Sequence, residues 1–122
     1  MARLSRIAPE IPVSDLREAI QYYEQKLGFQ VVGQMRAGDY AIVERDDVAI
    51  HLFANDAGRH SPVSIHVFTH GLDELEAELL ERGVELSQKI MRKPWGSRDF
   101  RVKDQSGNEL KFTDTVPNGD DA

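Results

Sequence analysis

Two histidines are the most distinctive candidates for chemistry in this sequence, and each is followed two residues later by a phenylalanine. His51 precedes Phe53, and His66 precedes Phe68. Because side chains alternate between the two faces of a strand, each histidine shares a face with its phenylalanine if these segments are extended. Strand register decides whether such a face lies in the core or lines a cleft. A cleft lined in this way suits planar heteroaromatic ligands better than hydrolysis.

Two further aromatic residues are candidates for ligand binding. One is Tyr40, at the start of another extended segment, and the other is Trp95. It is the only tryptophan and lies between Pro94 and Gly96 in a polar stretch. A tryptophan in such a stretch is expected to be partly exposed, where its ring can stack on a planar ligand. The alternative is that Trp95 packs at a strand bend.

Several kinds of catalytic site are excluded by what the sequence lacks. There is no cysteine, so a thiolate nucleophile, a zinc–thiolate site and a disulfide are all excluded. We find no phosphate-binding loop, dinucleotide fingerprint, HExxH pattern or Ser-His-Asp arrangement. The candidates that remain favour binding over catalysis.

The first half of the chain predicts a short strand, a helix and three further strands. Asp15 and Glu18 can form a capping box, and an apolar stripe at helical spacing leads to Gly28, where the helix ends. The extended segments of this half are residues 11–13, 29–32, 40–45 and 48–53.

The second half repeats this order, with a strand at 63–68, a helix at about 72–82 that ends at Gly83, and extended segments at 84–90, 98–102 and 109–113. Leu72, Leu75, Leu79 and Leu80 form the expected apolar stripe of the second helix. The predicted fold is α+β: two tandem βαβββ modules with curved mixed sheets, helices on the outside and a cleft between the sheets. We place these modules at about 7–54 and about 62–115 of a single domain, 1–122, with a linker at 55–61 and a tail at 116–122. Whether two sheets enclose the cleft within one chain or across a dimer is left open by the sequence.

Distinctive motifs stand at both ends of this repeat. The opening motif is PVSDL at 12–16 followed by Leu27-Gly28-Phe29, and the closing motif is DQSGNEL at 104–110. These motifs resemble those of the glyoxalase, bleomycin-resistance and extradiol-dioxygenase superfamily, which has the vicinal oxygen chelate fold. Segments 71–75 and 93–100 look most like the bleomycin-resistance branch. The resemblance implies a homodimer that binds and sequesters an antibiotic without chemistry.

The same resemblance bears on metal binding. Enzymes of the superfamily place His or Glu at four inward-facing positions, which by motif matching fall on Ala8, His51, Ser64 and Lys111. Alanine has no lone pair, a serine hydroxyl is a poor ligand for Zn²⁺ or Ni²⁺, and a lysine ammonium repels a divalent cation. We therefore expect no metal, no cofactor and no catalytic residue.

A metal-dependent lyase, isomerase or dioxygenase of the same fold is the alternative. Its site would have to combine His51 and His66 with a carboxylate from Glu10 or Glu109. A carrier or sensor of an unrelated small molecule is a third possibility.

Two further residues gain a role through the resemblance. Lys111 takes a cleft position, where it can bind a carbonyl or sulfate of the ligand and discourages a cationic group nearby. Pro9 matches a position where the N-terminal strand crosses to the partner subunit, so it is a candidate dimer arm. The expected ligand-binding residues are Trp95, Tyr40, His51, Phe53, His66, Phe68 and Lys111.

Charge and composition limit the partners. The chain has 122 residues, with 15 Lys and Arg against 21 Asp and Glu, which gives a net charge of −6 and argues against nucleic acid. It has no apolar run of membrane-spanning length and no signal-peptide pattern, so we expect a cytoplasmic protein without a membrane partner. The expected function is metal-free sequestration of a bleomycin-type or other planar antibiotic in an aromatic cleft at a dimer interface, which would confer resistance.

Overall fold

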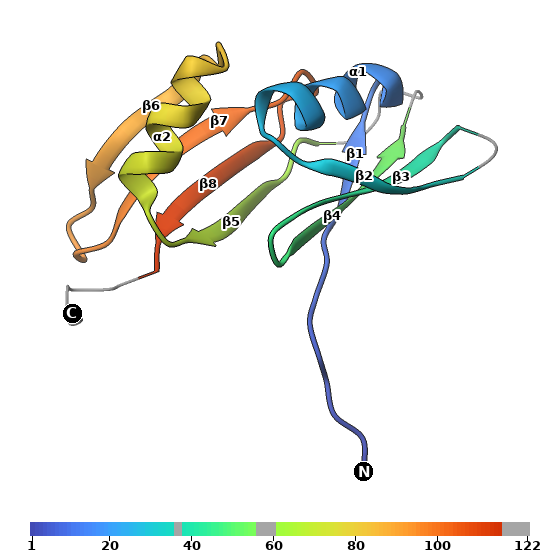
Figure 1. Cartoon of the computed structure of the whole chain (residues 1–122), viewed down its shortest axis with the longest axis horizontal. Coiled ribbons are helices and arrows are strands. Elements are labelled where there is room, and N and C mark those ends of the chain that lie inside the picture. The colour runs from blue at the N-terminus through green and yellow to red at the C-terminus, as the bar shows by residue number, and fades with distance from the viewer. Residues whose placement is uncertain (36–37, 56–60, 116–122) are drawn as a thin grey trace.

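The computed structural model describes residues 1–35, 38–55 and 61–115, which form two four-stranded sheets, each with a helix packed on one side (Figure 1). The strand order is β1-β4-β3-β2 in the first sheet and β5-β8-β7-β6 in the second. In each sheet the first strand runs parallel to its neighbour and the other pairs are antiparallel. This confirms the predicted α+β fold of two βαβββ modules with mixed sheets.

The observed elements lie close to the predicted ones. The first module contains β1 (Glu10–Val13), α1 (Leu16–Gln21), a π-helical segment (Tyr22–Lys26), β2 (Gln30–Gln34), β3 (Tyr40–Arg45) and β4 (Val48–Ala54). The second contains β5 (Ser64–Thr69), α2 (Leu72–Glu81), β6 (Leu86–Arg92), β7 (Arg98–Lys103) and β8 (Glu109–Asp114). Residues 56–60 of the predicted linker and the predicted tail at 116–122 lie outside the described residues.

The first helix departs from the uniform helix that its apolar stripe predicts. Asp15 caps it as expected, accepting a 3.0 Å hydrogen bond from the backbone N–H of Glu18. After Gln21, however, the chain widens into a π-helical turn, which the Leu27 N–H closes by donating to the Tyr22 carbonyl at 3.2 Å. A single wide turn leaves the spacing of apolar residues nearly unchanged, so the sequence pattern does not reveal it.

In the second helix, one residue of the predicted apolar stripe is not buried. Leu72 and Leu79 are buried, but Leu80 is 48% exposed. Successive helical residues point about 100° apart, so Leu80 falls at the edge of the stripe, where the core does not cover it. This helix begins at Leu72 after Gly71, whose φ of 73° lies in the left-handed region that suits glycine.

Strand alternation gives each sheet one face against a helix and one face turned away, which we call the open face. In β4, for example, Ile50 and Leu52 point to the helix side and are buried. His51 and Phe53 alternate with them, point to the other side and are only partly buried. The buried faces of both sheets and both helices merge into one apolar core that includes Tyr23 and Leu27 of the first module and Leu79 and Phe112 of the second. The open faces are therefore the surfaces left for function.

The two modules are also joined by an ion pair. Both guanidinium NH groups of Arg45, at the end of β3, donate to the carboxylate of Glu78 in α2, at 2.8 and 3.1 Å.

Among the described helices, none is long and apolar enough to cross a bilayer.

Candidate functional site

The open face of the first sheet brings together three of the predicted site residues, Tyr40, His51 and Phe53. Tyr40 is the cross-strand partner of Phe53, and His51 lies on the same face of β4 as Phe53. The Tyr40 and His51 rings meet edge to face with centroids 5.6 Å apart. Both rings are partly exposed, so this face can receive a ligand.

Hydrogen bonds fix the orientation of these rings. The Tyr40 hydroxyl donates to Oε2 of Glu10 at 2.9 Å and also lies 2.6 Å from Nδ1 of His51. With the single hydroxyl proton directed at Glu10, the second bond is completed by the His51 tautomer that carries its proton on Nδ1. That tautomer leaves the lone pair of Nε2 as a hydrogen-bond acceptor.

The pKa of Tyr40 is consistent with this arrangement. Partial removal from water, the hydrogen bond to Glu10 and the negative charge of Glu10 all raise the pKa of Tyr40 above its ordinary value. A tyrosine hydroxyl is already protonated at neutral pH, and the raised pKa keeps this one a donor into more alkaline solution. The sequence singled out Tyr40, but it did not indicate that Glu10 is its partner.

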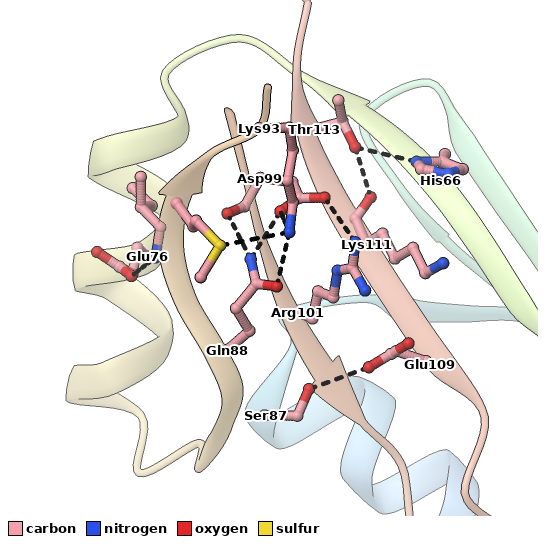
Figure 2. Close-up of polar contacts among 12 residues, drawn as sticks. His66, Glu76, Ser87, Gln88, Lys93, Asp99, Arg101, Glu109, Lys111 and Thr113 are labelled. Atoms are coloured by element: carbon pink, nitrogen blue, oxygen red, sulfur yellow. Dashed lines mark hydrogen bonds and ion pairs between the residues drawn. The ribbon is translucent and has the colours of Figure 1, made fainter. Parts of the chain in front are cut away.

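The open face of the second sheet carries His66, Phe68 and Lys111. His66 and Phe68 are exposed on β5, on either side of the buried Val67, and their rings stack with centroids 6.1 Å apart. Nδ1 of His66 lies 3.1 Å from the Thr113 hydroxyl, which itself donates to the Lys111 carbonyl at 3.2 Å. With the hydroxyl proton directed at that carbonyl, the first bond is completed by the His66 tautomer that carries its proton on Nδ1; Figure 2 draws both bonds.

Beside these residues lies a charged cluster around Asp99, which is only 3% exposed. Gln88 donates to its carboxylate at 2.7 Å. Arg101 at 3.3 Å and Lys93 at 3.6 Å form ion pairs with it (Figure 2). Burial opposes ionisation of Asp99, but the hydrogen bonds from Gln88 and Arg101 and the two positive charges outweigh burial and lower its pKa. The alternation of Asp99 and Arg101 with the buried Phe100 was the only signal in the sequence that could have placed them on the open face.

Trp95 and Pro9 lie at the margins of these faces. Trp95 is 71% exposed in the turn between β6 and β7, at the same end of the second sheet where β5 and β8 finish. The carbonyl of Pro9, just before β1, accepts a 2.9 Å hydrogen bond from the His51 N–H. The predicted residues thus form one group on each sheet, and the hydrogen bonds and ring contacts that involve them in the described part of the chain stay within each sheet.

A pocket of about 460 Å³ lies elsewhere, between the two modules, and the sequence did not predict it. Buried Leu27, Phe29 and Phe112 contribute its apolar floor, and Asp46 and Glu74 contribute to a largely acidic rim. Phe68 is the one predicted site residue among those that line it. The pocket is assembled by residues far apart in sequence, which explains why no local pattern indicated it.

The sequence and the fold of this chain are similar to those of known proteins. The sequence model of the glyoxalase/bleomycin resistance protein/dioxygenase superfamily matches residues 3–112. The chain belongs to this superfamily. The resemblance inferred from the motifs at both ends of the repeat is therefore confirmed.

Within the superfamily, the similar proteins include bleomycin resistance proteins. One from Geobacillus stearothermophilus is 29% identical over 123 residues, covering 85% of this chain and 92% of the relative. The crystal structure of a bleomycin resistance determinant encoded on the transposon Tn5 matches with a TM-score of 0.81 at 20% identity, covering 91% and 98% of the two chains. A bleomycin-binding protein complexed with bleomycin matches with a TM-score of 0.79, the same identity and the same coverage. At such identities the two structures show that the fold is shared.

The superfamily includes metal-dependent enzymes, so the donor set of this chain must be tested against a metal. The matching positions hold Ala8, His51, Ser64 and Lys111, and only His51 is a good ligand for a divalent cation. Within residues 1–35, 38–55 and 61–115, no three His, Asp or Glu side chains come together as a metal site. His51 and His66 lie on different sheets, so the alternative set of His51, His66 and a carboxylate does not assemble within one chain and would need opposed sheets of two copies. The residues present do not fit the superfamily metal.

Proposed function

We propose that this protein binds and sequesters a bleomycin-type or other planar antibiotic, without metal and without chemistry, and thereby confers resistance. The observation that carries the proposal is the pair of open sheet faces, each presenting a histidine beside an aromatic ring: Tyr40 with His51, and His66 with Phe68. Aromatic rings gain stacking energy on flat heterocycles in addition to the area that they bury. The bleomycin resistance proteins that resemble most of this chain support the same function.

The cleft of this proposal is completed by a second copy of the chain. On the second sheet Phe68 is 66% exposed and Met91 is 49% exposed, which leaves apolar surface that an opposing sheet would cover. Placing the first sheet of one copy over the second sheet of the other would bring the two groups of predicted residues into one site. Each dimer would then hold two such sites.

The N-terminal segment supports this dimer. Residues before β1 extend away from both sheets (Figure 1), and Leu4 and Ile7 are 98% and 92% exposed. Its ion pair, between Arg6 and Glu44 at 3.3 Å, is on the surface and contributes little. We place Pro9 at the point where this segment crosses to the partner.

A calorimetric titration tests the proposal. Metal-stripped protein is titrated with metal-free bleomycin, and the molar mass is measured by light scattering in the same buffer. Saturation near one drug per chain in a dimer is the expected result. No heat from the drug, combined with tight uptake of one Zn²⁺, Ni²⁺ or Fe²⁺ per chain, would instead support a metal-dependent enzyme.

A further inference from the structure

Two positive side chains lie directly opposite each other on the open face of the second sheet. Lys111 of β8 is the cross-strand partner of Arg101 of β7, and on its other side it pairs with His66 of β5. Like charges at opposed positions of a sheet destabilise it. The pair is more unusual because the chain carries a net charge of −6. A repulsion that lowers the stability of the fold at one place is expected where a partner of opposite charge binds.

Neighbouring acidic groups offset only part of this positive charge. The carboxylate of Asp99 is shared between ion pairs with Arg101 and Lys93, so one negative charge faces two positive ones. Glu109, two residues before Lys111 on the same face, accepts a hydrogen bond from Ser87 at 3.3 Å. In the described part of the chain, the Lys111 ammonium makes no hydrogen bond or ion pair, and Figure 2 draws none from it to the other residues shown. The ammonium is therefore available to a ligand.

Arg101 supplies a second donor group that is not fully used. A guanidinium has five N–H groups, and in the described residues Arg101 has one hydrogen bond, from NH2 to Asp99. Its Nε is buried without a hydrogen-bond partner in the same part of the chain. A buried donor without an acceptor costs free energy. The terminal N–H groups of Arg101, whose side chain is 25% exposed, are the donors that a ligand can reach.

Aromatic surface adjoins these two cations. His66 pairs with Lys111 across the strands, and its ring stacks on Phe68, which is 66% exposed. A ligand that stacks on this pair of rings brings any substituent on its edge within reach of the neighbouring strand. We propose that the ligand of this site is an aromatic acid, whose carboxylate or sulfonate binds Lys111 and Arg101 while its ring stacks on His66 and Phe68. This inference rests on the proposed binding function and narrows its ligand class.

Two fluorescent probes that differ by a single sulfonate test this inference. They are 8-anilinonaphthalene-1-sulfonate and its uncharged parent, N-phenyl-1-naphthylamine, and both brighten when they leave water. We expect the full-length protein to prefer the sulfonate. Lys111→Gln should weaken sulfonate binding by about tenfold, the value of one charge-assisted hydrogen bond, and leave the parent unchanged. Lys111→Arg should restore most of the affinity.

A matched control removes the same charge elsewhere. Arg17→Gln alters an exposed arginine of α1, on the helical side of the first sheet, and should change neither probe. Thermal unfolding of each variant checks that the fold is retained. The inference is overturned if Lys111→Gln weakens both probes equally, if Arg17→Gln matches its effect, or if the wild type binds both probes alike. Titration with bleomycin separates this inference from the proposed function. If bleomycin saturates the protein but Lys111→Gln leaves sulfonate binding unchanged, the aromatic-acid ligand is overturned and antibiotic binding stands. If sulfonate binding depends on Lys111 but bleomycin does not bind, the bleomycin-type ligand is overturned and the aromatic-acid site stands.

Discussion

The hydroxyl of Tyr23 in the first module donates a 2.9 Å hydrogen bond to Oδ2 of Asp104 in the second. Both side chains are buried. Burial and the adjacent Asp104 charge raise the pKa of Tyr23 well above its ordinary value, so the hydroxyl remains a donor. Asp104 also accepts from the side-chain amide of Asn108, which donates onward to the Pro12 carbonyl at 2.7 Å. The DQSGNEL motif therefore ties the second module to the first.

Removing the Tyr23 hydroxyl should destabilise the protein by weakening this tie. Tyr23→Phe leaves a buried carboxylate with one donor fewer, which costs about 1–3 kcal/mol. The free energy of unfolding in urea measures the effect. Tyr22→Phe is the matched control, because the Tyr22 hydroxyl donates to a neutral carbonyl, that of Lys103, at a longer 3.2 Å and in a more exposed place. If both variants lose the same free energy of unfolding, the hydrogen bond to Asp104 stabilises the protein no more than the bond to the Lys103 carbonyl.

The free energy of unfolding should fall at acidic pH because Asp99 becomes protonated. Its pKa is lowered in the folded state, so ionised Asp99 stabilises the fold above its unfolded pKa, and this contribution is lost as pH falls through the folded value. We expect Asp99→Asn to lower the unfolding free energy by about 1–3 kcal/mol at neutral pH. The difference between wild type and variant should be constant above about pH 5 and shrink below about pH 4. A difference that stays constant down to pH 3 would contradict the assignment.

The fold could be predicted from the sequence to the extent that its determinants are local. Apolar periodicity and the turn glycines predicted the strands and helices of two βαβββ units, and period-2 alternation predicted that His51 shares a face with Phe53 and His66 with Phe68. The π-helical turn after Gln21 was missed because it preserves that periodicity. The partners of the site were missed for another reason: Glu10 meets Tyr40 across 30 positions of sequence. Such contacts depend on strand order, which local patterns do not encode.

Removing the N-terminal segment should weaken the proposed dimer. Leu4 and Ile7 have little contact with their own chain, so deleting residues 1–8 removes apolar side chains whose burial depends on a partner. Light scattering should give a dimer for the full chain and a shift toward monomer for the deletion at micromolar concentration. The double variant Leu4→Ser, Ile7→Ser should act in the same direction without shortening the chain. A monomeric full-length protein would remove Pro9 from any dimer arm.

Trp95 should contribute directly to drug binding. As an aromatic plane that is 71% exposed at the end of the second sheet, it can stack on a flat heterocycle without rearrangement of the fold. Trp95→Ala should weaken bleomycin binding by about 1–3 kcal/mol, the value of an aromatic hot spot. Because Trp95 is the only tryptophan, its emission in the wild type should also change as drug is added. Leu80→Ala is the control, since Leu80 is 48% exposed on α2, away from both open faces, and its loss should leave the affinity unchanged. If drug binds with unaltered emission and Trp95→Ala retains full affinity, Trp95 lies outside the site and the stacking surface reduces to the rings on the strands.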